Sequence, residues 1–571
     1  MVPGQLWRTV RVAGLIVAFA GISLAQTESD DVAQLKAQVA RLEKQIELLS
    51  QKLEQVAGMA SQQTAAAAPA SEGAQSNEPA SPPARTYPPK SLTASTTPVP
   101  AAIPAAAPPS TTVPVTPPLP RAPAAPQGGP AATASPLQLR LGNVTITPVG
   151  FMDLTGDWKS ENAGGSLGTN FGNFPYNNVV PQSKLTEWRF SPQNSRIGFR
   201  VDGEWKGWRF IGYNEMDFLG TSGTNNLSVT NGAFVPRLRL YWVDTQKGKF
   251  EFLAGQSWSL LTPNRKGLSP LPGDIFYSQV MDVNYIIGLT WTRQPGVRFV
   301  YHPSTKVAMG LAMENPDQYM GGSAGGSTIT LPALYSGFAG VQLDNSSNVQ
   351  TIPNLTPDFI AKIAFDPSSR VHFEVAGIER NFKVYDTAGP RVGLYSTVAG
   401  GGGSVNGNFE VVKNLRIISN NYYSDGGGRY IFGQAPDLII RPDGTISPIH
   451  SAGFNEGFEA TAGKFLFFGY YGAAYIRRNT AIDTNGTLVG YGYRGAPNSQ
   501  NKSIQEVTFG YNETLWKNPA YGAINIIGQY EYALRNPWYI APNTPKNAHF
   551  NTVYVDVRYT LPGSAPTVLP K

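Results

Sequence analysis

Seven charged residues between positions 196 and 239 share a pattern that could act on passing ions. They lie in three successive stretches in which apolar and polar residues alternate. Residues two apart on a β-strand share a face, so Ile197, Phe199 and Val201 on one face put the nearby arginines on the other. The basic residues of the predicted inward-facing set are Arg196, Arg200, Arg209, Arg237 and Arg239, and the acidic ones are Glu215 and Asp217.

On the third of these stretches, we expect Leu238, Leu240 and Trp242 to face outward. A charge on a lipid-facing wall costs roughly 2 to 4 kcal/mol near the midplane, so the arginines belong on the inner face. Inward arginines select anions in pores, which predicts a basic wall that favours small anionic solutes. The alternative is that the arginines pair with Glu215, Asp217 and other interior acids as a structural network, and the sequence leaves both interpretations open.

The strands that would carry these charges recur along most of the chain. About sixteen stretches with a two-residue rhythm lie between Val144 and Leu561. In the last of them Val555 and Val557 fall on one face and Tyr554 and Asp556 on the other, a spacing that no helix produces. The predicted strands are 144–157, 190–202, 207–219, 235–245, 249–261, 291–302, 306–314, 358–366, 370–385, 403–412, 415–424, 453–462, 464–478, 502–513, 522–535 and 548–561.

The connections between these strands alternate in length. Tight turns such as 202–204 and 366–368 follow the even strands, and long segments such as 158–189, 315–357 and 425–452 follow the odd ones. Bacterial outer-membrane barrels have short periplasmic turns and long outer loops. The sequence therefore predicts an all-β transmembrane β-barrel of about sixteen antiparallel strands over residues 141–562, with a short tail at 563–571.

Composition agrees with a barrel. Only 15% of the residues are charged, 11% are aromatic, and no run of eighteen apolar residues follows the amino terminus, which argues against a helical membrane protein. Several tryptophans near predicted strand ends fit the aromatic girdles of membrane interfaces, although aromatic residues favour strands in general. These tryptophans are Trp205, Trp208, Trp242, Trp516 and Trp538.

Three segments precede the predicted barrel. Residues 1–25 read as a secretory signal peptide, with two arginines, an apolar run and small residues at its end. Residues 26–59 carry an apolar heptad pattern that predicts a short parallel coiled coil, hence an oligomer, and its β-branched and leucine positions favour two strands. Residues 60–140 are rich in proline and alanine and predict a disordered linker.

Four motifs resemble the DcaP-type porins of Gram-negative outer membranes. They read SPQNSRIGFR at 191–200, GYNEMDF at 212–218, AMENP at 312–316 and DGGGRY at 425–430. The resemblance implies a trimeric porin in the outer membrane, with a preference for small anionic solutes such as dicarboxylates. It also implies that the connection 262–290 folds inward to narrow the lumen, with Arg265, Lys266, Asp274 and Asp282 at the constriction. The even strand count and the short periplasmic turns predict that the coiled coil and linker lie in the periplasm.

Other functions find little support. His302, His372, His450 and His549 lack metal-ligand spacing, the chain has no cysteine, and the glycine run 400–403 lacks the features of a phosphate loop and reads as a flexible outer loop. We expect no catalysis, metal or cofactor. The dispersed basic residues of an exported chain of net charge +6 do not indicate nucleic-acid binding. The alternative function is a structural tether, in which the amino-terminal region contacts peptidoglycan and transport is incidental.

Overall fold

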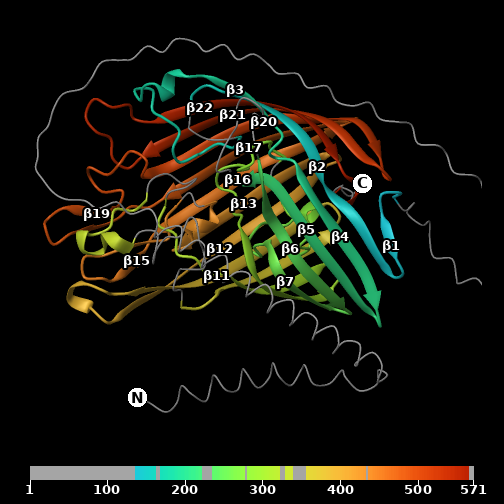
Figure 1. Ribbon diagram of the computed structural model, residues 1–571, viewed down its shortest axis with the longest axis horizontal. Helices are drawn as coiled ribbons and strands as arrows, with labels where there is room; N and C mark the ends of the chain where they lie inside the picture. The colour runs from blue at the N-terminus through green and yellow to red at the C-terminus, as the bar shows by residue number, and fades with distance from the viewer. Residues whose placement is uncertain are drawn as a thin grey trace, which may run out of the picture. The chain divides into compact units, whose positions relative to one another are not determined.

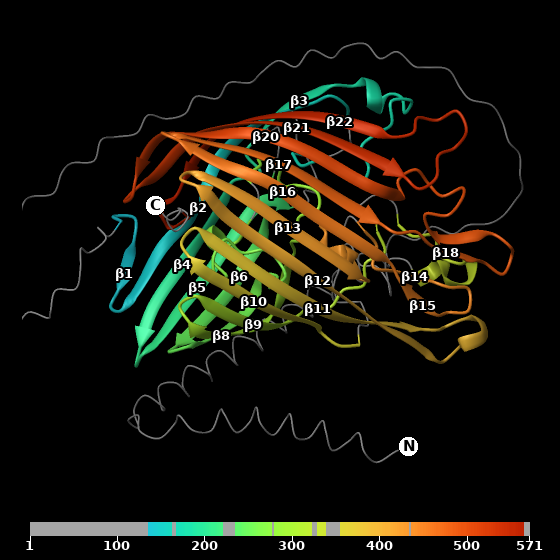
Figure 2. The ribbon, with the colours of Figure 1, turned by 180° about the vertical axis from the view of Figure 1, so that it is seen from behind.

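The chain forms a closed antiparallel β-barrel (Figures 1 and 2). The computed structural model describes residues 135–162, 167–220, 234–276, 279–321, 328–338, 355–432 and 435–564. The sheet closes because β2 (Val144–Lys159) pairs with β22 (Ala548–Thr560) on one side and with β3 (Glu187–Ser191) and β4 (Arg196–Trp205) on the other. Closure leaves no unpaired edge, as a bilayer requires.

Within the described residues the wall has sixteen strands, as the sequence predicted. The segments β3 and β4 form one interrupted wall strand. The remaining strands are β5 (Trp208–Gly220), β6 (Val235–Lys247), β7 (Phe250–Trp258), β8 (Arg293–Ser304), β9 (Val307–Glu314), β10 (Asp358–Ser368), β11 (Val371–Tyr385), β12 (Tyr395–Val412), β13 (Leu415–Asp425), β16 (His450–Ala462), β17 (Phe465–Ile476), β20 (Asn501–Asn518) and β21 (Gly522–Pro537).

The long connections gather at one end of the barrel and the short turns at the other (Figures 1 and 2). Two long connections form hairpins of their own, β14 (Leu438–Ile440) with β15 (Ile446–Pro448), and β18 (Asn479–Ile482) with β19 (Leu488–Tyr491). These hairpins share one buried apolar cluster with residues of the connection after β9. The outer connections therefore pack on one another.

The wall has an apolar outer face and a polar inner face. On β22, Val555 and Val557 are 46% and 51% exposed, whereas Tyr554 and Asp556 are fully buried. The predicted alternation is confirmed on this strand, and the exposed apolar face is suited to lipid.

Two details of the wall differ from the sequence prediction. The glycine run 400–403 lies within β12 and not in a loop. Close neighbours explain this, because a Cβ at Gly400 would lie 2.8 Å from the Phe382 ring and one at Gly401 would lie 2.7 Å from the Ile378 carbonyl oxygen. Glycine lets these strands approach closely and remain paired.

A β-bulge in β6 reverses the predicted facing of two residues. Glu215 pairs with Leu240 and Met216 with Leu238, so Arg239 is an extra residue on β6. Leu238 faces outward as predicted, but Leu240 and Trp242 are buried on the inner side. Trp242 therefore belongs to no aromatic girdle.

The other tryptophans divide between the two ends of the wall. Trp205, Trp208 and Trp516 are exposed near the short turns. Trp538 is half-buried at the end with the long connections, where its indole donates a hydrogen bond to the Ile476 carbonyl.

The first and the last described residues lie at the short-turn end of the barrel. The hydroxyl of Ser135 donates a hydrogen bond to the carbonyl of Ala520, in the turn between β20 and β21. The short strand β1 (Leu139–Leu141) forms a hairpin with β2. The turn η7 (Pro562–Ser564) lies against β2, where a Cβ at Gly563 would approach the Thr147 side chain.

The signal peptide, the coiled coil and residues 60–134 of the linker lie outside the described residues, as do residues 565–571 of the predicted tail. None of the helices in the described ranges has the length and hydropathy needed to cross a membrane.

We predict that Leu311→Arg destabilises the barrel by about 2 to 4 kcal/mol, because it places a charge on the lipid face of β9. Leu311 is 62% exposed near the middle of this strand. Urea unfolding in liposomes measures the change. Leu488→Arg, in the exposed hairpin arm β19, is the control and should cost less than about 0.5 kcal/mol. Equal effects of the two substitutions would contradict a lipid-facing belt.

Candidate functional site

The connection between β7 and β8, residues 259–292, crosses the barrel interior. Its backbone amides donate hydrogen bonds to inward-facing groups on distant strands. Asn264 donates to Glu374 of β11 at 3.2 Å, Gln279 to the hydroxyl of Tyr470 on β17 at 3.1 Å, and Ile287 to Glu506 of β20 at 3.0 Å. The remaining partners include Glu459 of β16, Tyr554 of β22 and Arg196 of β4. The connection thus contacts the wall on all sides.

The four predicted constriction residues have different environments. Arg265 pairs with Glu459 at 2.7 Å and its guanidinium lies 5.0 Å from the centre of the Phe276 ring. Lys266 is exposed, and Asp274 is half-buried in η2 (Pro272–Asp274). Asp282 is buried, accepting hydrogen bonds from Thr169 N at 2.8 Å and the Tyr554 hydroxyl at 3.0 Å. This burial raises the pKa of the Asp282 carboxyl.

A second connection, between β13 and β16, also enters the interior. The amide of Trp291 donates a 3.0 Å hydrogen bond to the Tyr430 carbonyl, in an isolated parallel bridge between Trp291 and Ile431. The Phe432 ring stacks on Trp291 with centroids 4.4 Å apart. Apart from the glycines of the DGGGRY motif, no pattern in the sequence predicts this insertion.

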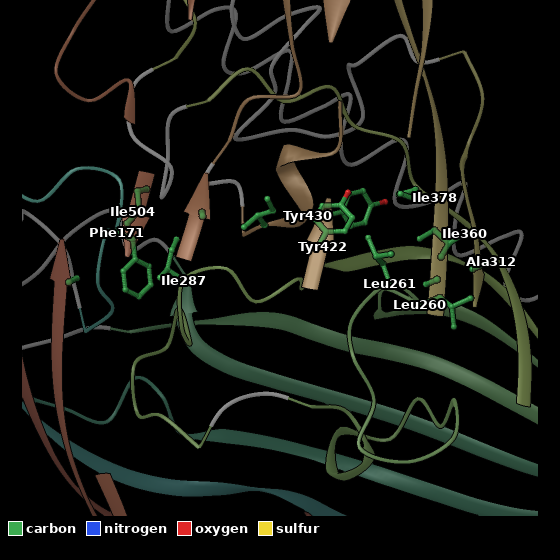
Figure 3. Packing of buried hydrophobic residues seen from close by; sticks show 14 of the residues in the cluster. Phe171, Leu260, Leu261, Ile287, Ala312, Ile360, Ile378, Tyr422, Tyr430 and Ile504 are labelled. Carbon is green, nitrogen blue, oxygen red and sulfur yellow. The ribbon is translucent and has the colours of Figure 1, made fainter. Parts of the chain in front are cut away.

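Inward-folded segments build a hydrophobic core inside the barrel. Phe171 and Phe174 come from the connection after β2, Leu260 and Ile287 from 259–292, and Tyr430 from the connection after β13; all are 0 to 1% exposed. Figure 3 shows part of this core, and the residues that it labels include Leu261, Ala312, Ile360, Ile378, Tyr422 and Ile504. At this level the inward-folded segments pack on the wall and on one another.

Two buried arginines hold the second connection to the wall. Arg380 of β11 pairs with Asp358 at 3.1 Å and with Asp437 at 2.8 Å. Arg429, in η6 (Gly428–Tyr430), pairs with Asp317 at 2.5 Å and with Asp358 at 3.2 Å. The network ties the connections after β9 and β13 together and includes Arg429 of the DGGGRY motif, whereas Glu314 of the AMENP motif accepts a hydrogen bond from the Leu260 amide at 2.7 Å.

The predicted basic wall falls into two groups. Toward the short-turn end, Arg200 pairs with Asp202 at 2.7 Å and Arg209 approaches the same carboxylate at 3.9 Å. The other group lies farther along the barrel. The five predicted arginines are therefore not one continuous ladder.

The second group, here called the arginine cluster, comprises Arg196, Arg237, Arg239 and Arg293 around Glu215 and Asp217. Arg239 binds Glu215 at 2.9 Å and Asp217 at 2.5 Å. Arg237 binds Asp217 at 2.7 Å, and Arg196 lies 3.6 Å from Glu215. The inward position predicted for these charges agrees with the pairing. The pairing also shows that a structural network is present.

Sequence reasoning missed three members of this region. Arg293 opens β8, and no carboxylate among the described residues pairs with it. Trp258 lies between two guanidiniums, 5.8 Å from Arg239 and 5.5 Å from Arg293. The hydroxyl of Tyr285 accepts hydrogen bonds from the cluster. Only the two strand-end positions could have been found from the alternation, because Tyr285 reaches the cluster through the fold of a long connection.

The neighbouring guanidiniums lower the pKa of the Tyr285 phenol. Burial would raise the pKa of its phenol, but the guanidiniums of Arg196, Arg239 and Arg293 together lower that pKa below its ordinary value. The phenol oxygen therefore lies in a strongly positive field.

The histidines have structural surroundings. The ring of His372 lies between Asp366 at 3.0 Å and Glu374 at 3.2 Å, and Glu374 also binds Lys362 at 2.8 Å. Among the described residues no group of three or more His, Asp or Glu side chains could hold a metal ion.

We predict that Arg429→Met loosens the inserted connection while the barrel stays folded. Removing one partner of a buried ion pair costs about 3 to 5 kcal/mol, and here the loss falls on loop docking. Limited proteolysis should cut within 435–449 at least tenfold faster than in the wild type. Arg441→Met, an exposed arginine of the same connection that only donates to Ser447, is the control. An unchanged cleavage rate of the Arg429→Met variant would mean that Arg429 does not hold the connection in place.

Comparisons with known proteins bear on the fold. No protein-family model matches the sequence, and no curated protein matches it. The outer membrane channel DcaP of Acinetobacter baumannii is similar in structure, with a TM-score of 0.54 and 16% identity over 73% of this chain and 98% of that one. The anion-selective porin of Comamonas acidovorans reaches a TM-score of 0.40 at 12% identity, covering 73% of this chain and all of that one. Salmonella typhi OmpF, in complex with daunomycin, also reaches 0.40, at 10% identity over 74% and 100% of the two chains. The resemblance that the four motifs predicted is confirmed at the level of the fold: the chain folds like the DcaP outer membrane channel.

Proposed function

We propose that the chain is an outer-membrane porin that passes small hydrophilic solutes and favours small anions. The fold and the lipid-suited outer face support a channel. The observation that carries the preference is the excess of positive charge in the arginine cluster. Four guanidiniums, those of Arg196, Arg237, Arg239 and Arg293, surround the two carboxylates of Glu215 and Asp217, which leaves an excess of two.

The positive side chains of the arginine cluster are more accessible to a solute than its carboxylates are. The side chain of Arg237 is 41% exposed, whereas those of Glu215 and Asp217 are 4% and 0% exposed. A solute entering from water therefore meets a guanidinium before it meets a carboxylate. A confined low-dielectric space focuses such a field and raises the local concentration of anions.

Acidic residues of β20 and β21 do not cancel this field for a solute. Glu506 and Glu531 are buried, and the inward-folded connections cover them through the Ile287 amide and the Thr169 hydroxyl. A net charge of two on the arginine cluster matches the charge of a dicarboxylate, which supports a dicarboxylate as the preferred solute. Ion pairing of the arginines and anion preference are compatible, since pairing fixes the geometry and the excess attracts the solute.

We predict that Arg237→Ser together with Arg293→Ser shifts the reversal potential toward cation preference. The double variant removes the excess of two charges while Arg239 remains to neutralise Asp217. Planar-bilayer recording under a KCl gradient measures the shift, and uptake of succinate into liposomes should slow more than uptake of a neutral sugar.

Arg370→Ser is the control, because Arg370 is exposed at a short turn and only approaches Glu410 at 4.0 Å. The control removes a positive charge outside the arginine cluster and so tests the effect of net charge alone. The cluster variant tests whether the position of the charge matters. An unchanged reversal potential in the cluster variant would mean that the arginines are structural only.

The proposed function also includes the assembly of the barrels and their orientation in the membrane. We propose a trimer of barrels, with the amino-terminal coiled coil and linker in the periplasm. The contact of Ser135 with the short turn at Ala520 supports this orientation, because the chain then enters from the short-turn end.

A protease site placed at Ser81 tests the orientation. It should resist cleavage in intact cells and be cut once the outer membrane is permeabilised. A site in the exposed turn at 485–486, between β18 and β19, should behave in the opposite way and is the control. Cleavage at position 81 in intact cells would reverse the topology.

A further inference from the structure

Tyr285 occupies a position that suits an anion. Its hydroxyl oxygen accepts hydrogen bonds from Arg196 at 3.2 Å and from Arg239 at 3.3 Å. The residue is 5% exposed and belongs to the connection 259–292, not to the wall. The phenol oxygen therefore takes the place between two guanidiniums where a carboxylate oxygen of a solute would bind.

An aromatic stack links this position to the second inserted connection. The ring of Tyr285 meets that of Trp291 edge to face at 4.8 Å, and Trp291 stacks on Phe432 at 4.4 Å with an interplanar angle of 14°. Trp291 also holds the backbone of the second connection through its bond to the Tyr430 carbonyl. The three rings join both connections at one point.

Two of these three residues have strained backbones. Tyr285 has a φ of +59° and Phe432 a φ of +50°, a left-handed conformation that bulky side chains rarely adopt. Such strain persists only where the surroundings enforce it, and it concentrates at ligand clamps and switches. Release of either ring from the stack would relieve it.

The stack lies where the interior is closed. Trp258, Leu289 and Ile431 around it are 0% exposed. Water reaches the exposed Arg237 of the arginine cluster but not Arg239 beneath it, whose side chain is 4% exposed. A solute that binds at Arg237 would have to displace Tyr285 to reach the next guanidiniums.

We infer that Tyr285, Trp291 and Phe432 form a latch that keeps the interior closed until an anionic solute replaces the Tyr285 hydroxyl between Arg196 and Arg239. This inference rests on the proposed function and adds its regulation. A carboxylate brings a negative charge between the two guanidiniums and offers two oxygens for bidentate hydrogen bonds, which the single hydroxyl oxygen of Tyr285 cannot do. The solute thus binds the open state better than the closed one, which is the condition for opening a channel. Displacement of Tyr285 unstacks Trp291 and releases the second connection at Phe432, while Arg380 and Arg429 still hold the rest of that connection.

The test is recording of the full-length protein in planar bilayers in KCl, with succinate or glucose added. The wild type should open rarely without succinate, and succinate should raise its open probability at least tenfold while glucose leaves it unchanged. Tyr285→Phe should open without succinate, because it leaves the two guanidiniums without the hydroxyl while keeping the ring. Phe432→Ala should also open without succinate, because it releases the second connection.

Tyr470→Phe is the matched control. Tyr470 is also buried, and its hydroxyl also contacts the connection 259–292, but its partners are the Gln279 amide and Glu459 instead of arginines. It should respond to succinate as the wild type does. If it opens without succinate as well, loss of any hydroxyl from this connection suffices and the latch is wrong.

A crosslink tests the moving part directly. Because the chain has no cysteine, Trp291→Cys with Ile431→Cys introduces the only two thiols, at positions paired in a β-bridge. The reduced double variant lacks the Trp291 ring and should open without succinate, whereas oxidation, which joins the two connections again, should close it. Equal conductance in the two redox states would overturn the latch.

The outcomes separate the two proposals. A wild type that is open in KCl and indifferent to succinate overturns the latch and leaves the porin standing. Closed Tyr285→Phe and Phe432→Ala channels that succinate still opens also overturn the latch. A protein that forms no channel in any variant overturns the porin itself.

Discussion

A closed barrel in lipid can place charged side chains only on its inner face, and this constraint shapes the rest of the molecule. Burying so many charges in a narrow interior favours pairing most of them, since an unpaired buried charge is far more costly than a paired one. The wall meets this requirement with short local pairs such as Arg200 with Asp202, and with a denser set around Glu215 and Asp217. The polarity of the inner face and the alternation of residues along each strand therefore both follow from the contact of the outer face with lipid.

The interior is filled by loops that use the same polar groups. Backbone amides of 259–292 are satisfied by wall carboxylates such as Glu374 and Glu506, so the loop and the wall depend on each other. Arg380 and Arg429 perform the same task for the connection after β13. Apolar side chains from these loops then pack in the space between, which gives a channel fold an interior like that of a soluble domain. Transport through such an interior needs movement of a loop.

The sequence predicted the wall well because alternation, turn length and charge all report on the same inner and outer faces. It failed where one residue broke the rhythm: the extra Arg239 turned Leu240 and Trp242 inward, and no pattern in the sequence marks a bulge. The glycines of β12 misled for a related reason, since their role depends on neighbours such as Phe382 that only the fold brings near. Tyr285 and Phe432 meet through loop packing between distant segments, which local sequence does not encode.

The central claim is that the interior presents a net positive surface to solutes. The sign of the wild-type reversal potential across a bilayer with a KCl gradient tests it most directly. A potential displaced toward the chloride equilibrium value is the expected result, because the exposed groups of the arginine cluster are guanidiniums. A potential displaced toward the potassium equilibrium value would contradict the account, since the buried carboxylates of β20 and β21 would then dominate the pore.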